Sequence, residues 1–213
     1  MTEAEWWDRA SPDDIKKYLH RKVSQRKAML FAVAAFRRLS YLLPDAWQLE
    51  GIDHLEQCAE GRAVNDESRR IIQGVRQAWP TTPELREPGT TDASQVALML
   101  YRALVSRDSV SQAISAAAGT TDGDQELRAQ CHLLRDIVGN PFRPVAIDPA
   151  WLTSNVVSLA QTIYDERRFD HLPILGDALE EAGCQSEHIL LHCRAGDKHW
   201  RGCWLIDLLL ERA

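Results

Sequence analysis

The sequence lacks any long apolar run. Its longest, AMLFAVAAF at 28–36, has nine residues, far fewer than the roughly 20 that a membrane-spanning helix needs. The opening residues, MTEAEWWDRA, have neither the basic start nor the apolar stretch of a secretion signal. Cysteine is also scarce, at five residues, and without a secretion signal we expect these thiols to be reduced. These absences predict a soluble, cytoplasmic protein with no membrane association.

Common motifs of enzymes are missing as well. The sequence contains no GxGxxG, P-loop, GxSxG, HExxH or CxxC, which are typical of dinucleotide binding, phosphate binding, hydrolysis and zinc sites. The turn GTTDGD at 119–124 has too few oxygen ligands at the right spacing for a calcium loop. We therefore expect no catalytic activity, although enzymatic Cys/His chemistry near the C-terminus stays an alternative.

Strand-like alternation of Val, Ile and Thr is almost absent, whereas helical spacing of apolar residues recurs along the chain. The sequence predicts an all-α fold, either a multi-helix bundle or an irregular helical array. A rigid, extended segment with three prolines is expected at 139–149, packed across the C-terminal helices. The predicted helices cover approximately 11–43, 46–60, 65–78, parts of 93–119, 125–138, 149–165, 172–182, 186–194 and 200–211.

A length of 213 residues suits one large domain or two small ones. We predict a single helical domain, 1–213. A sub-boundary at 79–92, where three prolines and a glycine interrupt the helical pattern, would separate N-terminal helices 1–78 from a C-terminal helical region 93–213.

Positive charge gathers near the N-terminus. No acidic residue lies between Asp14 and Asp45, and eight basic residues give 15–44 a charge of +8 in a chain of net charge −6. We expect acidic residues of the body, such as Asp177, Glu180 and Glu181, to neutralise most of this charge. An acidic protein partner and nucleic acid are the alternatives, and nucleic acid is disfavoured because no aromatic RNA-binding motif is present.

Several stretches occur together in a known family. RKAMLFAVAAFRRL (26–39), GNPFRPVAIDPAW (139–151), LPILGDALEEAGC (172–184), HCR (192–194) and HWRGCW (199–204) resemble a paralogous family of uncharacterised bacterial proteins. The resemblance covers most of the chain, least over 46–120, and implies no activity. Family members often carry a cysteine pair where this chain has Ala35 and Phe36, so the resemblance implies that those positions take no part in a metal site here.

Three of the five cysteines and three of the seven histidines lie within 182–204. Core packing is the interpretation we favour, because free cysteine is among the most buried residue types. Structural zinc is the alternative, and for it we predict the ligands Cys184, His192, His199 and Cys203. The choice of His192 over His188 follows from the resemblance, in which HCR recurs. Cys193 would then fill the core beside Ile189 and Leu190.

Taken together, these patterns predict a non-catalytic protein-interaction module that binds a protein partner. The seven tryptophans are expected to anchor helices, and an exposed Trp6/Trp7 pair would suit a binding surface. A zinc-containing helical enzyme and a nucleic-acid-associated factor are the alternatives.

Overall fold

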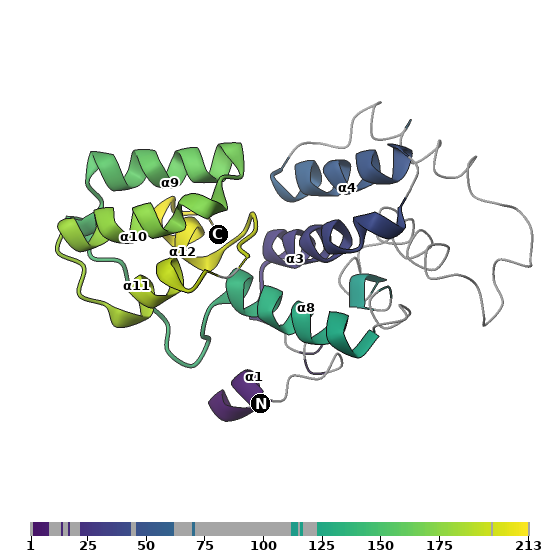
Figure 1. The fold of residues 1–213 in the computed structure, drawn as a ribbon, viewed down its shortest axis with the longest axis horizontal. Coiled ribbons are helices and arrows are strands. Elements are labelled where there is room, and N and C mark those ends of the chain that lie inside the picture. The colour runs from purple at the N-terminus through teal and green to yellow at the C-terminus, as the bar shows by residue number, and fades with distance from the viewer. Residues whose placement is uncertain are drawn as a thin grey trace, which may run out of the picture. The chain divides into compact units, whose positions relative to one another are not determined.

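The computed structural model describes residues 2–8, 14, 17, 22–43, 46–61, 70, 112–114, 116, 123–196 and 198–212. Within these ranges the protein contains helices and no strand, so the prediction of an all-α fold is confirmed (Figure 1). The α-helices are α1 (Glu3–Asp8), α3 (Gln25–Arg38), α4 (Ala46–Ala59), α8 (Gly123–Val138), α9 (Ser154–Glu166), α10 (Leu172–Glu181), α11 (Glu187–Arg194) and α12 (Trp204–Leu209). Short 3₁₀ helices cover Ser40–Leu42, Pro149–Trp151 and Phe169–His171.

The chain divides into two compact units, Met1–Leu134 and Arg135–Ala213. Helix α8 continues through the point of division, and its last turn belongs to the second unit. The predicted sub-boundary at 79–92 lies outside the described residues, as does the predicted helix 65–78 apart from Arg70. No described helix combines the length and the apolar character that crossing a membrane would require.

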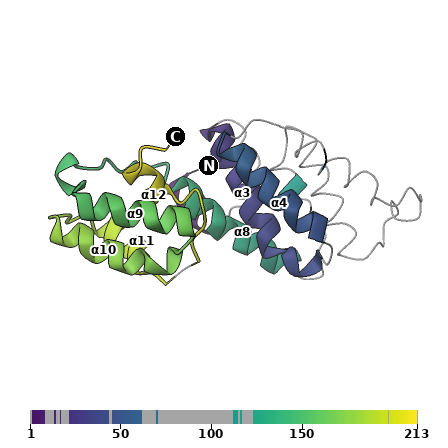
Figure 2. The same ribbon diagram turned by 90° about the horizontal axis from the view of Figure 1, so that it is seen from above.

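The first unit is built on α3, which packs beside α4 (Figures 1 and 2). Ser24 caps the start of α3, and its hydroxyl oxygen accepts a hydrogen bond from the Lys27 N–H at 3.3 Å. Every residue from Leu30 to Phe36 is buried, so this helix is covered on all sides. An apolar surface around the whole circumference of a helix is typical of a position inside the core.

The three arginines of α3 pair with carboxylates of their own unit. Its arginines form these ion pairs: Arg26 with Glu60, Arg37 with Asp53 and Glu56, and Arg38 with Glu126. The partners differ from those we expected, because Asp177 and Glu180 pair with Arg194 instead, at 2.7 and 2.6 Å. The carboxylates that pair with these arginines lie close to them in the fold. Their separation along the sequence does not reveal which acidic residues these are.

The second unit packs α9, α10, α11 and α12 around one apolar core. Helices α9 and α10 lie side by side in both views (Figures 1 and 2). Gly139 ends α8 with φ 74° and Gly183 follows α10 with φ 92°, as their positions in the sequence predict. Between α8 and α9, residues 139–148 form no helix, and Val145 and Ile147 pack against the core of the unit.

The last helix begins later than we predicted. Residues 198–203 are a loop, and α12 starts at Trp204 instead of near residue 200. The reason is Gly202, whose φ of 96° is incompatible with a right-handed helix. Cys203 follows in a non-helical conformation as the N-cap residue. This loop determines the position of two of the candidate ligands.

Candidate metal site

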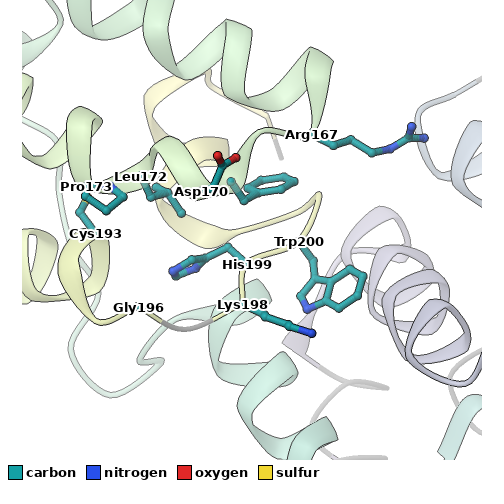
Figure 3. A pocket seen from close by; sticks show the side chains of 10 residues that line it. Arg167, Asp170, Leu172, Pro173, Cys193, Gly196, Lys198, His199 and Trp200 are labelled. Carbon is teal, nitrogen blue, oxygen red and sulfur yellow. The ribbon is translucent and has the colours of Figure 1, made fainter.

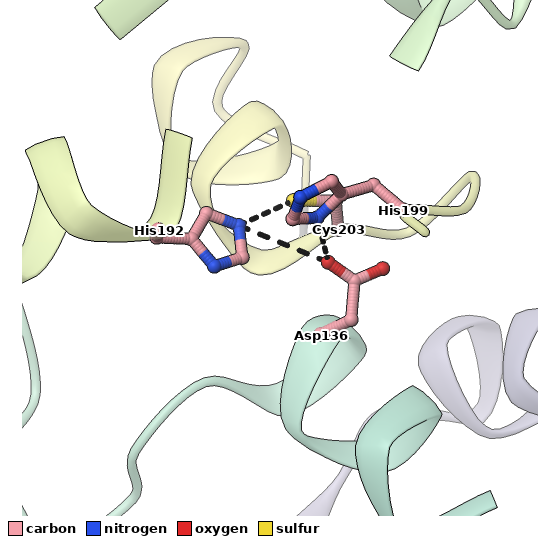
Figure 4. Close-up of side chains that lie close together, drawn as sticks. All are labelled: Asp136, His192, His199 and Cys203. Atoms are coloured by element: carbon pink, nitrogen blue, oxygen red, sulfur yellow. Dashed lines mark hydrogen bonds and ion pairs between the residues drawn. The ribbon is translucent and has the colours of Figure 1, made fainter. Parts of the chain in front are cut away.

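Four side chains that can bind a metal converge in the second unit (Figure 4). They are Asp136 in the last turn of α8, His192 in the last turn of α11, His199 in the loop after α11 and Cys203 at the N-cap of α12. One ligand atom from each residue lies within 4.8 Å of the ligand atoms of the other three. The group could therefore hold a metal ion.

Two glycine turns bring the C-terminal members together. After α11 ends at Arg194, Gly196 adopts φ 69° and the chain reverses towards His199. Gly202 then turns the chain a second time, immediately before Cys203. Both conformations lie in the left-handed region that glycine tolerates and most side chains do not. Glycine at these two positions therefore allows the backbone conformations that precede His199 and Cys203.

The site is closely hydrogen-bonded. His192 Nε2 lies 3.1 Å from Cys203 Sγ, and 3.8 Å from Asp136 Oδ1. The second carboxylate contact is shorter, with His199 Nδ1 at 2.6 Å from the same Oδ1. The backbone N–H of Trp200 donates to Asp136 Oδ2 at 3.0 Å, so both oxygens of this carboxylate have partners. Asp136 and Cys203 are buried, and Cys203 is fully inaccessible to solvent.

Burial controls the protonation of His192. Loss of solvent lowers its pKa to about 4, although the nearby Asp136 carboxylate acts in the opposite direction. His199 and His188 lower the pKa of His192 further through charge repulsion. At neutral pH His192 is therefore an uncharged imidazole, the form that binds metals. The low pKa of His192 disfavours an imidazolium–thiolate pair with Cys203, which is the usual way to activate a catalytic cysteine.

Three of the four predicted ligands lie together: His192, His199 and Cys203. Cys184 is not in the group, and lies in the apolar core that also contains Cys193. Asp136 occupies the fourth place, which sequence reasoning missed. The sequence offered one sign of this role. Asp136 lies on the same helix face as Leu133 and Ile137, which are buried, and an acidic residue on an apolar face needs a partner.

Cys193 does not belong to the group, although it adjoins His192 in sequence. It is buried beside Ile189 and contacts the backbone of α10 near Gly176. Burial raises the pKa of its thiol to about 12, and the neighbouring Cys184 also contributes. A thiol with such a pKa stays protonated at neutral pH and is a poor nucleophile. Cys193 therefore has a packing role.

A cavity of about 350 Å³ is lined in part by His199, a member of the candidate metal group (Figure 3). Residues between 167 and 173 and residues between 193 and 200 line it. Lys198 and Arg167 contribute positive charge to its lining, and Phe169 and Trp200 contribute aromatic rings. His199 belongs both to this lining and to the candidate metal group.

Comparisons of the chain with protein-family models, with curated proteins and with solved structures give no match. Two imidazoles, one thiolate and one carboxylate are the donor types that Zn²⁺ accepts in proteins, usually four of them in a tetrahedral arrangement. The donors of this group fit that ion.

Proposed function

We propose that this protein is a non-catalytic protein-interaction module whose second unit contains a structural zinc site. The ligands are Asp136, His192, His199 and Cys203. A single observation carries the proposal, namely the convergence of four buried or half-buried ligand groups from three separate segments within 4.8 Å. Such a group of polar side chains is costly to bury unless hydrogen bonds or a metal satisfy it.

The donor set favours zinc over the common alternatives. Calcium and magnesium prefer sites made entirely of oxygen ligands, and this site offers one carboxylate. A thiolate with two imidazoles is typical of zinc, which needs no particular electronic geometry. His192 is already uncharged at neutral pH because its pKa is about 4, so zinc displaces no proton from an imidazolium there.

The position of the site supports a structural role. A bound ion would join the end of α8, the end of α11 and the loop before α12. The loop 198–203 is not helical and is held by a few hydrogen bonds, among them Cys203 N–H to the Trp200 carbonyl at 2.9 Å and Trp200 N–H to Asp136 at 3.0 Å. In sites of this kind, the free energy of metal binding adds directly to the stability of the fold.

The choice of a protein as partner rests on charge and exposure. Arg26, Arg37 and Arg38 are already paired with carboxylates, which weakens their attraction for nucleic acid phosphates. Ile174 on α10 and Leu191 on α11 are 53% and 60% exposed, respectively. Exposed apolar side chains on helices are common at protein–protein contacts.

Elemental analysis of protein purified without added metal tests the zinc site. We expect about one zinc per chain, and a strong chelator should lower the melting temperature by roughly 10 °C, because ligation energy contributes to folding. Cys203→Ala should lose the zinc. Cys184→Ala is the matched control, because it removes another buried thiol of the same unit and should retain the metal.

Two results would contradict the structural site. One is less than about a tenth of an equivalent of zinc with a melting temperature that a chelator does not change. The other is equal retention of zinc by folded Cys184→Ala and Cys203→Ala, which would show that Cys203 is not a ligand.

The cavity beside His199 favours a second candidate, a zinc-containing helical enzyme. Catalytic zinc keeps one coordination position open for water or substrate, whereas structural zinc has four protein ligands. X-ray absorption spectroscopy of the zinc-loaded protein separates the two. We expect one sulfur and three nitrogen or oxygen ligands, unaffected by small zinc-binding anions; displacement of an oxygen ligand by such an anion would favour the enzyme.

A further inference from the structure

Both ring nitrogens of His192 have partners. Nδ1 accepts a hydrogen bond from the indole N–H of Trp204 at 3.2 Å, and Nε2 lies 3.1 Å from Cys203 Sγ. Trp204 cannot easily move away, because it is buried and its ring stacks on His188 with centroids 5.1 Å apart. On another side it lies against Gly139, where an added Cβ would be 3.0 Å from the indole.

These contacts determine which nitrogen carries the proton. An indole N–H can only donate, so Nδ1 of His192 must present a lone pair. A neutral imidazole has one lone pair and one N–H, so the proton is on Nε2 and points towards Cys203. The metal-free site is therefore a complete hydrogen-bonded chain from Trp204 through His192 to Cys203.

The tautomer with its proton on Nε2 cannot bind a metal through that nitrogen. Nε2 is the nitrogen that faces Cys203 and Asp136, and a metal there needs its lone pair. The proton must then move to Nδ1, where it meets the indole N–H, a second donor. Metal-binding histidines normally donate their other N–H to a carboxylate, a carbonyl oxygen or water, and Trp204 offers none of these.

We infer that Trp204 and zinc compete for His192: the indole N–H holds the metal-free tautomer, and zinc binding breaks that hydrogen bond. The inference rests on the proposed zinc site and concerns its regulation. Trp204 is a positioning residue, because it acts through His192 and does not touch the metal. Since it is also the first residue of α12, zinc loading is coupled to the start of the last helix.

The tautomer of His192 can be measured directly in the unaltered protein by long-range ¹H–¹⁵N correlation spectra. Without metal we expect the proton on Nε2, and with one equivalent of zinc we expect it on Nδ1. The indole N–H of Trp204 should shift or lose its protection from exchange at the same step. The same tautomer in both states, with zinc bound, would overturn the competition while leaving the zinc site intact.

Removal of the indole donor provides the quantitative test. Trp204→Phe should bind zinc about 5- to 100-fold more tightly in a chelator competition, since an opposed donor is removed. Trp151→Phe is the matched control, because Trp151 packs against the same core and lies outside the site, and it should bind as the wild type does. Equal or weaker binding by a folded Trp204→Phe overturns the inference. Absence of zinc binding in every variant overturns the zinc site and the inference together.

Discussion

Cys193 and Cys203 are both fully buried, yet their sulfur atoms have different surroundings. Cys203 faces the imidazole of His192, whereas Cys193 faces apolar neighbours and the backbone of α10. Cys58 is the exception among the five thiols, because it is only half-buried. Its sulfur lies 3.5 Å from His54 Nε2.

These differences predict the order of thiol labelling. In native protein at pH 8 we expect one thiol, Cys58, to react with an alkylating reagent, more slowly than a free thiol because burial raises its pKa. The other four should react only on unfolding. Peptide mass spectrometry of pulse-labelled protein identifies the site, with Cys58→Ser as the control. Rapid labelling of Cys203 in metal-free protein would contradict the buried geometry of the site.

At the scale of elements, α10 and α11 approach each other closely through a glycine. A Cβ added at Gly176 would lie 2.8 Å from Cys193 Cβ, closer than carbon atoms normally approach. Here the close approach of two helices requires glycine, since Gly176 lies within a helix and has no positive φ. The contact also fixes α11, which carries His192.

We expect Gly176→Ala to lower the free energy of unfolding by about 1–3 kcal/mol, as overpacking does, although alanine favours a helix by about 1 kcal/mol. Chemical denaturation measures the change. In a Cys193→Gly background, where the opposing Cβ is gone, the same substitution should cost less, and the double-mutant cycle should give a favourable coupling. A stabilised Gly176→Ala single variant would show that the helices separate readily.

At the scale of the whole molecule, stability should depend on pH through two half-buried histidines, His192 and His188. The folded pKa of His192 is about 4, below its ordinary value of 6.5. The unfolded chain therefore binds more protons between these values, and the free energy of unfolding falls as the pH falls from 6.5 towards 4. The stabilisation is fully present above pH 6.5. His188 acts in the same direction, because burial and Arg143 lower its pKa.

Metal-free protein, kept so with a chelator, should lose up to about 3 kcal/mol of stability across this interval. Denaturation curves at a series of pH values provide the measurement. His192→Gln should flatten the dependence, with part remaining from His188. If the free energy of unfolding of His192→Gln depended on pH as steeply as that of the wild type, the titrating group would be a residue other than His192.

The sequence by itself determined the features that depend on neighbouring residues. Apolar spacing predicted the all-α fold, and Gly139 and Gly183 marked helix ends because glycine readily adopts positive φ. Enrichment in cysteine and histidine indicated the region of the site. The predicted start of the last helix was too early because the conformation of Gly202 is set by the loop around it and not by apolar spacing.

Which side chains lie together in the candidate site depends on the tertiary structure. Asp136, not Cys184, lies beside His192, His199 and Cys203, because the last turn of α8 packs in the second unit. The tautomer of His192 depends on Trp204, which is twelve residues away in sequence. Ligand sets and proton positions arise from distances across the fold, and these follow from how helices pack rather than from local spacing.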